Sequence, residues 1–239
     1  MIGARGRALM LGLVAAFAAA LIALALSFSS RPQADASRPT LLLLTSLPLV
    51  FGEDLSLEDG GSPALTALQK QYRVIPISVA SPAELKKGRL LLMAQPLAQP
   101  AENLVALDDW VRKGGRVLLL ADPMLEWPSE RPLGDPVRPP PMFSDTGLLG
   151  HWGLRLDSPE ERGPKQGMVG GAQVMTASPG VLAGKGCAVS NDGLVAYCRI
   201  GKGSATVIAD ADLLDIEHLD GPTENNLSAV LAELAALSR

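Results

Sequence analysis

The chain has 239 residues, of which 47% are hydrophobic and 19% charged, a composition too apolar for a disordered protein and too polar for a multi-span membrane protein. Its 21 Lys and Arg against 25 Asp and Glu give a formal net charge of −4, which argues against a dedicated nucleic-acid binder. The charge is uneven, because residues 1–30 carry only Arg5 and Arg7 and the remainder therefore holds 19 bases against 25 acids.

An uncharged apolar run extends from Ala8 to Ser30. A helix needs about 20 apolar residues to cross the hydrocarbon layer, so this run predicts a transmembrane anchor over residues 8–30. Arg5 and Arg7 place residues 1–7 in the cytoplasm by the positive-inside rule. The rest of the chain is then expected in the periplasm, on a single-pass protein of the inner membrane.

A cleaved signal peptide is the alternative interpretation of the same run. It has a positive start, an apolar centre and a candidate A-x-A site at Ala34-Asp35-Ala36. That site lies six residues beyond the apolar run, and the run is longer than the 7–15 residues usual for a signal peptide, which favours the anchor. Both interpretations make residues 40–239 extracytoplasmic.

Residues 31–39 are polar and flanked by proline, which predicts a linker. The apolar run Thr40–Thr45 predicts a strand buried on both faces. Ser62–Tyr72 begins with Ser and Pro and spaces its leucines as a helix does. Two more strands are expected at Arg73–Val79, where Pro76 favours an edge position, and at Arg89–Ala94.

The clearest pattern lies between residues 100 and 121. Pro100–Lys113 predicts a helix, because Leu104, Leu107, Trp110 and Val111 form one apolar stripe. Gly114-Gly115 ends that helix, and the strand Arg116–Ala121 follows at once. A helix, a glycine stop and an apolar strand make half of a βαβ crossover.

Further elements complete an α/β fold class with a mostly parallel sheet flanked by helices. Ser204–Ala209 predicts a strand, and Asn225–Ser238 predicts a helix with Leu227, Val230, Leu231 and Leu234 on one face. Residues 128–141 contain six prolines and predict a long irregular loop, suited to a functional surface or to docking a partner. Residues 40–239 are therefore expected to form one extracytoplasmic domain.

Cys187 and Cys198 flank the turn signal Asp192-Gly193, which predicts a β-hairpin. If these two residues form the loop, position i pairs with 385 − i and the cysteines lie opposite each other. A disulfide with a structural role is then expected in an oxidising compartment, although a two-residue loop would place it on a strained hydrogen-bonded pair. A three-residue loop would move the cysteines out of opposition by one residue.

Three carboxylates follow predicted strands: Asp122 after one strand, and Asp210 and Asp212 after another. Ligands of open parallel sheets gather outside the carboxyl ends of the strands, so the three carboxylates are expected to converge. They could serve as a metal or acid–base site, with Glu217 and His218 nearby. The alternative, which we favour, is that each Asp caps a helix or braces a turn.

Other chemical signatures give no support for catalysis. His151 and His218 are the only histidines, and His151 is expected to be a structural residue at or near the surface. The sequence has no G-x-S-x-G, P-loop or G-x-G-x-x-G motif, and Gly201-Lys202-Gly203 predicts a tight turn. We therefore expect no cofactor, no metal and no partnered nucleophile.

Three segments together resemble a known family: LDDWVRKGGRVLLLADP at residues 107–123, GKGSATVIADADLL at 201–214 and ENNLSAVLAEL at 224–234. The set resembles the extracytoplasmic domains of the ABC-transporter auxiliary family of the gliding-motility type. It is also similar to single-anchor periplasmic proteins with a glutamine-amidotransferase-like fold. The resemblance covers about residues 90–239, with TLLLLTSLPL as the family's first strand.

This resemblance implies a class I amidotransferase-like, flavodoxin-related sheet that carries a β-hairpin insertion and lacks amidotransferase chemistry, because both cysteines lie in a hairpin. It implies a non-enzymatic binding or accessory domain, with an ABC permease and ATPase or other envelope proteins as partners. The chain departs from the larger family members in having no membrane segment after Leu234, which weakens the link to a transporter. The alternative function is a carboxylate-dependent periplasmic hydrolase that uses Asp122, Asp210 and Asp212.

Overall fold

The structure is a computed structural model that describes residues 38–50 and 61–239. The predicted anchor at residues 8–30 and nearly all of the predicted linker lie outside the described residues. Among the residues that are described, no helix combines the length and apolar character needed to cross a membrane. Pro39 to Arg239 form one compact unit.

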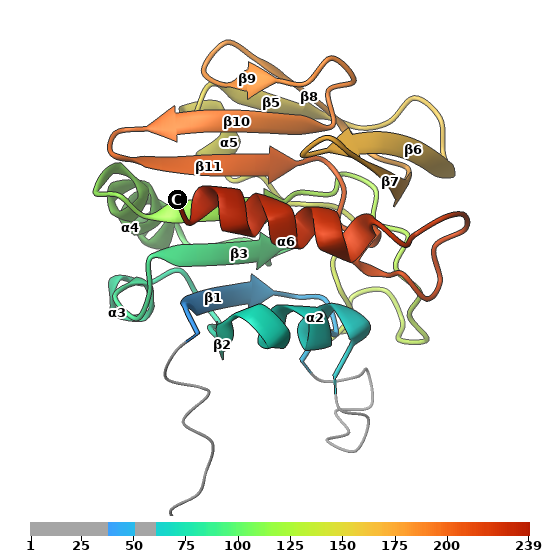
Figure 1. Ribbon diagram of the computed structural model, residues 1–239, viewed down its shortest axis with the longest axis horizontal. Helices are drawn as coiled ribbons and strands as arrows, with labels where there is room; N and C mark the ends of the chain where they lie inside the picture. Colours follow the sequence, from blue (N-terminus) through green and yellow to red (C-terminus); the bar gives the residue numbers. More distant parts are fainter. Residues whose placement is uncertain (1–37, 51–60) are drawn as a thin grey trace, which may run out of the picture. The chain divides into compact units, whose positions relative to one another are not determined.

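A seven-stranded sheet forms the centre of this unit (Figure 1). Its strand order is β2-β1-β3-β4-β11-β10-β9. Five of these strands are parallel: β1 (Thr40–Thr45), β2 (Arg73–Pro76), β3 (Leu90–Ala94), β4 (Arg116–Leu120) and β11 (Gly203–Ile208). β10 (Val195–Ile200) and β9 (Ala188–Val189) extend the sheet in antiparallel steps. The predicted α/β class with a mostly parallel sheet is confirmed.

Helices cover both faces of the sheet (Figure 1). In the view of Figure 1, α2 (Pro63–Gln71) and α6 (Asn226–Leu237) lie in front, and α4 (Ala101–Arg112) lies behind, in contact with the short α3 (Pro82–Leu85). The strands between them are buried, as β3 shows with five buried residues out of five. Ser62 caps α2 by accepting from the backbone N–H of Leu65, as its sequence pattern predicts.

Several predicted elements match the structure closely. β1 has the predicted bounds, and β2 is an edge strand, as Pro76 predicts. α4 buries Leu107 and Val111 from its predicted stripe and half-buries Leu104 and Trp110. No helix or strand interrupts residues 121–147, the predicted Pro-rich loop included.

Residues 148–184 contain elements that the sequence did not predict. They are the short helix α5 (Leu148–His151), the antiparallel pair β5 (Leu154–Asp157) and β8 (Val181–Gly184), and the antiparallel pair β6 (Pro164–Val169) and β7 (Ala172–Ala177). β6 buries only its last residue, so its sequence shows no apolar alternation. A 3₁₀ turn, η2 (Asp212–Leu214), follows β11.

The predicted hairpin and its disulfide are present. Ala188 pairs with Tyr197 and Val189 with Ala196, so both pairs sum to 385 as expected. Cys187 and Cys198 form a disulfide with their Cα atoms 4.4 Å apart.

The expected loop is wrong, because the backbone N–H of Ser190 donates to Val195 O and closes four loop residues in place of two. This change shifts the hydrogen-bonding phase and puts the cysteines on a non-hydrogen-bonded pair, for which Cα atoms lie about 4.5 Å apart. The strained pair that a two-residue loop predicts is therefore avoided.

Candidate functional site

Asp122, Asp210 and Asp212 converge at the carboxyl edge of the sheet, where β4 and β11 lie side by side. One ligand atom from each of the three carboxylates lies within 4.8 Å of the others. This proximity follows from the parallel pairing of Ile208 with Leu120, because Asp210 and Asp122 each lie two residues after these paired residues. The three side chains are almost completely shielded from solvent, with at most 2% exposure.

Backbone N–H groups donate hydrogen bonds to the oxygens of these three carboxylates. Asp122 accepts from Met124 N–H at 2.8 Å and from Ala211 N–H at 2.9 Å, one to each oxygen. Asp210 likewise accepts one amide on each oxygen, at 2.7 and 3.0 Å, from the turn that follows it and from the end of β7. Asp212 accepts from Glu126 N–H at 2.8 Å, across 86 positions of sequence. The carboxylates therefore tie the loops after β4, β7 and β11 to one another.

Burial and nearby negative charges raise the pKa of all three carboxyl groups. Burial is the main cause for each, and it raises the pKa of Asp122 to about 6 and that of Asp212 to about 8. Burial together with the charges of Asp122 and Asp212 raises the pKa of Asp210 well above its ordinary value. The cluster therefore retains protons near neutral pH.

Carboxylates are the ligands that hard cations prefer, and this cluster is the one group of three His, Cys, Asp or Glu residues in the described part of the chain that could hold a metal ion. Both oxygens of Asp122 and of Asp210 already accept amide hydrogens, and the side chains lie beneath the surface. This geometry fits the turn-bracing role that the sequence favoured. It also meets the condition set by the alternative, namely converging carboxyl groups with raised pKa values.

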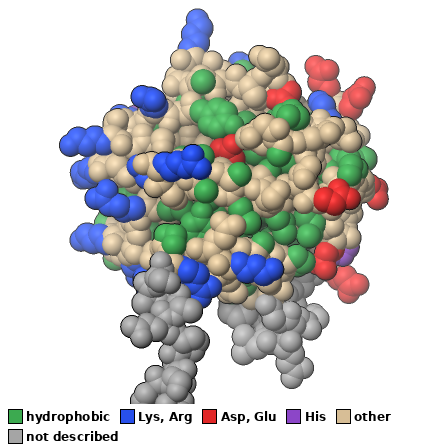
Figure 2. Space-filling view, in the orientation of Figure 1, with side chains coloured by type: hydrophobic (Ala, Val, Ile, Leu, Met, Phe, Trp, Pro, Cys, Tyr) green, Lys and Arg blue, Asp and Glu red, His purple; other side chains and the backbone are tan. Residues whose placement is uncertain are grey.

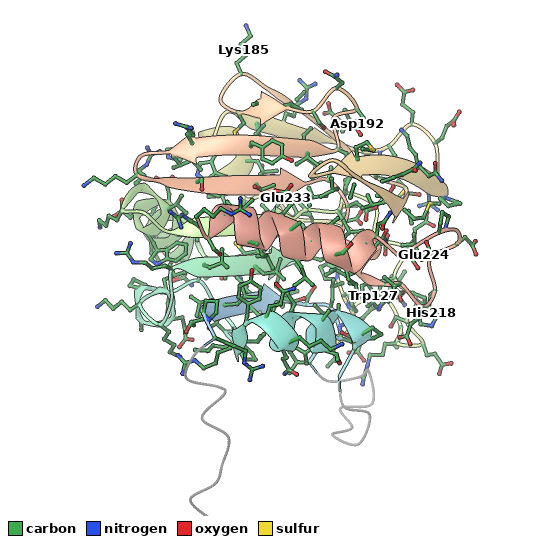
Figure 3. All side chains as sticks on the ribbon, in the orientation of Figure 1. Trp127, Lys185, Asp192, His218, Glu224 and Glu233 are labelled. Atoms are coloured by element: carbon green, nitrogen blue, oxygen red, sulfur yellow. A yellow bond between two sulfur atoms is a disulfide. The ribbon has the colours of Figure 1, made fainter. Side chains whose placement is uncertain are left out.

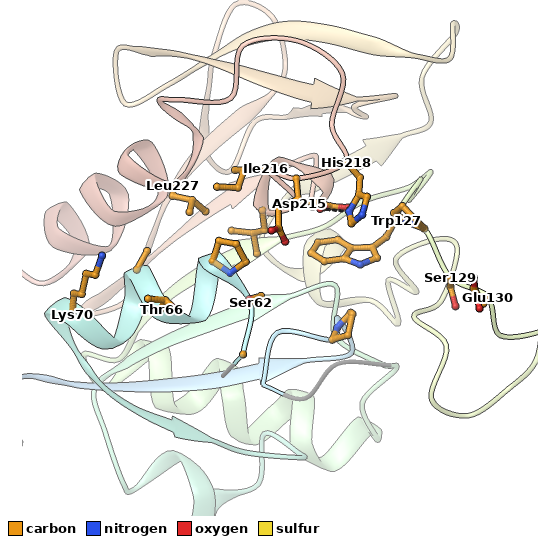
Figure 4. A pocket seen from close by; sticks show the side chains of 17 residues that line it. Ser62, Thr66, Lys70, Trp127, Ser129, Glu130, Asp215, Ile216, His218 and Leu227 are labelled. Atoms are coloured by element: carbon orange, nitrogen blue, oxygen red, sulfur yellow. Dashed lines mark hydrogen bonds and ion pairs between the residues drawn. The ribbon is translucent and has the colours of Figure 1, made fainter. Parts of the chain in front are cut away.

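A wide cleft of about 950 Å³ lies at the same edge of the sheet, beside this cluster (Figure 4). One wall is a face of α2 that extends from its start to Lys70, and the others are the start of the Pro-rich loop and the segment after η2. The indole of Trp127 extends into the cleft below His218 and Asp215 (Figure 4). Lys70 lies at one end and Glu130 toward the other, and the Trp127 indole and the Asp215–His218 pair lie between them (Figure 4).

An ion pair between Asp215 and His218 lines the cleft. Their Oδ1 and Nδ1 atoms lie 2.9 Å apart, and the hydrogen bond and charge of Asp215 raise the pKa of the imidazole. The Asp215 side chain is 8% exposed and that of His218 is 61% exposed, so a fixed carboxylate orients an accessible imidazole. Figure 3 shows His218 and Trp127 near each other at this side of the molecule. A smaller hollow of about 100 Å³ shares Asp215 and His218 and is also lined by Asp212.

His151 lies elsewhere, in the groove between α4 and α5. It is 58% exposed, and its Nε2 lies 3.3 Å from Asp108 Oδ2, which matches its expected place at the surface. Asp108 also accepts from Trp152 Nε1 and Arg112 Nε. The two histidines thus each have an aspartate partner, and only His218 lines the large cleft.

Two buried side-chain amides, for which no sequence motif indicates a role, also shape this edge. Gln95, in a left-handed conformation at the end of β3, donates from Nε2 to Asp122 O and accepts from Asp122 N–H. Asn226, at the start of α6, accepts from Met175 N–H and donates to Met175 O and Leu213 O. Trp127 was missed as well, although a Trp beside the Pro-rich loop is a signal that could have indicated a binding surface.

No protein-family model matches the chain, and no protein of curated function matches its sequence. Solved structures do match its fold. The exo-beta-1,4-mannosidase Op5Man5 from Opitutaceae bacterium strain TAV5 matches with 14% identity and a TM-score of 0.51, over 84% of this chain and 36% of the mannosidase. The N-terminal domain of mmIFT52 matches with 13% identity and a TM-score of 0.51, over 82% of this chain and 97% of that domain.

A third match is Gan42B, a GH42 beta-galactosidase, with 13% identity and a TM-score of 0.50, over 84% of this chain and 30% of the enzyme. The chain therefore spans about a third of the glycosidases that it matches and nearly all of the mmIFT52 domain. None of the three is named as a transporter auxiliary or an amidotransferase. At these identities the likeness is one of fold: this chain shares an α/β domain with proteins of different activities.

Proposed function

We propose that the protein is a membrane-anchored, periplasmic, non-enzymatic binding domain that takes a segment of a partner protein into the carboxyl-edge cleft. The observation that carries this proposal is the separation between the cleft and the aspartate cluster. The cleft is lined by the exposed Lys70 and His218 and by the partly buried Trp127, whereas Asp122 and Asp210 are buried and bonded to backbone amides.

The cleft has the features of a protein-binding surface. A partly buried aromatic side chain among prolines gives an apolar anchor point, and the charged side chains that line the cleft give orientation. The partner proposed is an envelope protein, in particular the permease or ATPase of an ABC-type transport system. The resemblance of residues 107–123, 201–214 and 224–234 to the transporter-auxiliary family supports this choice. On the same resemblance, the fold proposed is the amidotransferase-like, flavodoxin-related variant of the α/β class.

The test is affinity purification of the full chain from native membranes in mild detergent, with identification of the proteins that copurify. We expect a permease and its ATPase to be recovered with the wild-type chain and to be lost with His218→Ala. The matched control is His151→Ala, which removes an equally exposed imidazole that also has an aspartate partner. Equal recovery with both variants contradicts binding through the cleft.

A carboxylate-dependent hydrolase remains the second candidate, because Asp122, Asp210 and Asp212 converge and have raised pKa values. In that case the purified chain would hydrolyse a glycan or peptide substrate and lose the activity with Asp212→Asn. Under the binding proposal, the three Asp→Asn variants change stability and alter no turnover.

A further inference from the structure

The edge of the sheet opposite the cleft is strongly basic. The segments that lead into β2, β3, β4 and β11 read YR, KKGR, RKGGR and RIGKG, so they contain nine bases and no acid. These nine residues form what we term the basic edge: Arg73, Lys86, Lys87, Arg89, Arg112, Lys113, Arg116, Arg199 and Lys202. All of them are exposed except Arg116, which is half-buried.

Strand register brings the basic edge together. Arg73 pairs with Thr40, Leu41 pairs with Leu90, and Arg116 pairs with both Leu90 and Ser204. The starts of five neighbouring strands therefore lie side by side, and every base just before them is at the same end of the sheet. Figure 2 shows Lys and Arg side chains gathered toward the left of the view, where these strands begin, and Asp and Glu toward the right.

Local pairing accounts for only part of this charge. Lys87, Arg112 and Lys113 lie at or just after the ends of α3 and α4. Each pairs with a carboxylate three or four residues earlier, at Glu84, Asp108 and Asp109. The helix dipole also stabilises basic residues near the carboxyl end of a helix. This effect accounts for the presence of these three residues and of Lys86. Arg73, Arg89, Arg116, Arg199 and Lys202 lie outside any helix, so the edge keeps a surplus of positive charge that the fold itself does not require.

The chain enters the domain at this same edge. Arg73 N–H donates to Pro39 O, which places the residue before β1 beside the basic edge. Nine residues, 31–39, separate this point from the uncharged apolar run of residues 8–30. A fully extended stretch of nine residues spans about 30 Å, so a membrane that holds the run remains within that distance of the basic edge.

We infer that the basic edge docks on an anionic lipid surface. The domain then contacts the membrane through the edge of the sheet at which the parallel strands begin, here called the amino edge, and the cleft faces away from the membrane. Lys and Arg near an anionic leaflet are attracted to it, and the short covalent connection keeps the local lipid concentration high. The inference rests on the proposed membrane attachment. It adds an orientation that neither the anchor nor the cleft requires.

The helix α6 offers two positions for a direct test, because it runs from the carboxyl edge to the amino edge. Asn225 and Ser238 are exposed residues at its two ends, about 20 Å apart at 1.5 Å per residue. The full chain would carry a fluorescent donor at Asn225→Cys or Ser238→Cys in lipid nanodiscs whose headgroups carry an acceptor. The native cysteines are joined in the disulfide and do not take the label.

In discs that contain phosphatidylglycerol, we expect energy transfer from position 238 to exceed that from position 225 by about two-fold, given the separation along α6. The difference should disappear in phosphatidylcholine discs and at about 0.5 M salt, where charges are screened within a few ångströms. It should also disappear in the triple variant Arg89→Gln, Lys113→Gln, Lys202→Gln. The matched control, Glu160→Gln, Glu161→Gln, Glu224→Gln, changes three exposed acids and should keep it.

Two results overturn the orientation alone. One is the same transfer ratio in both lipids. The other is a transfer ratio that appears only when a disc holds two chains, which would mean that the basic edge binds the carboxyl edge of a second copy. Failure of the chain to remain with the discs overturns the membrane attachment, and the inference with it.

Discussion

The two edges of the central sheet differ in how they are built. At the amino edge the connections are short, as in the two-residue turn Gly201-Lys202 between β10 and β11, and they carry bases. At the carboxyl edge the loops after β4 and β11, residues 121–147 and 209–225, carry eleven acids against two Arg. Short turns hold one edge together through tight backbone packing, whereas the long loops of the other edge depend on buried side-chain hydrogen bonds.

The largest expected loss of stability comes from removing a buried side chain that makes several hydrogen bonds at the carboxyl edge. Asn226→Ala deletes three buried hydrogen bonds to Met175 and Leu213, and should lower the free energy of unfolding by about 4 kcal/mol. Urea unfolding measures the loss. Asn225→Ala is the matched control, because the exposed Asn225 makes no side-chain capping bond to α6 and should cost under ~1 kcal/mol. Equal losses would contradict the role of Asn226.

At the amino edge, we expect a change that disturbs the backbone packing to destabilise the fold. A Cβ atom on Gly203 would overlap the carbonyl oxygens of Gly115 and Val111, so Gly203→Ala should lower the free energy of unfolding by about 3 kcal/mol. Gly150→Ala is the control, since nothing lies within 4 Å of its Cβ position. Thermal unfolding of the two variants compares them, and a neutral Gly203→Ala would show that this edge tolerates expansion.

The disulfide joins the two strands of the β9–β10 hairpin. Cys187 and Cys198 are 11 residues apart, and closing a loop of this length restricts the unfolded chain enough to contribute about 2–3 kcal/mol. The double variant Cys187→Ser, Cys198→Ser should lose that amount in urea unfolding. Reduction of the wild-type chain should lower its stability to the same level, and a reductant that leaves its stability unchanged would contradict a structural role.

The aspartate cluster should make stability depend on pH. Raised pKa values mean that the folded chain holds these protons more tightly than the unfolded chain, in which Asp titrates near 3.9. Their contribution is therefore complete below about pH 4 and is lost as pH rises through about 6 for Asp122 and about 8 for Asp212. For each proton that the folded chain holds and the unfolded chain does not, the free energy of unfolding falls by up to ~1.4 kcal/mol per pH unit as pH rises between the unfolded and folded pKa values.

Asp212→Asn should flatten this decline between about pH 6 and pH 8, while its side-chain oxygen still accepts from Glu126 N–H. Asp109→Asn, which changes an exposed carboxylate on α4, is the control that should leave the profile unchanged. Urea unfolding across this pH range measures the slope. A wild-type chain that grows more stable as pH rises from 5 to about 8 would contradict the assignment.

The elements that the sequence predicts best are those with a strong local signal. β1, β3 and β4 are short apolar runs with Pro, Gly or Asp within two residues of an end, and Gly114-Gly115 ends α4 where the pattern predicts. The position of Asp122, Asp210 and Asp212 also follows from sequence, because the carboxyl ends of parallel strands share an edge. These inferences need only strand periodicity and the rules of α/β sheets.

What the sequence does not predict depends on contacts between distant segments. The strands β5 to β8 form between residues 154 and 184, and the exposed β6 lacks alternation. The roles of Gln95 and Asn226 arise from partners 27 and 51 residues away. The cleft combines α2, the Pro-rich loop and the segment after η2, so its lining is visible only once the chain has folded.

Site-specific photo-crosslinking in intact cells tests binding through the cleft most directly. A photoreactive residue would replace Thr66, an exposed position in the cleft wall, or Val105, which is 66% exposed on the opposite face of the sheet. We expect one discrete adduct with an envelope protein from position 66, lost with His218→Ala, and none from position 105. Adducts at position 105 alone, or equal adducts at both positions, would contradict binding through the cleft.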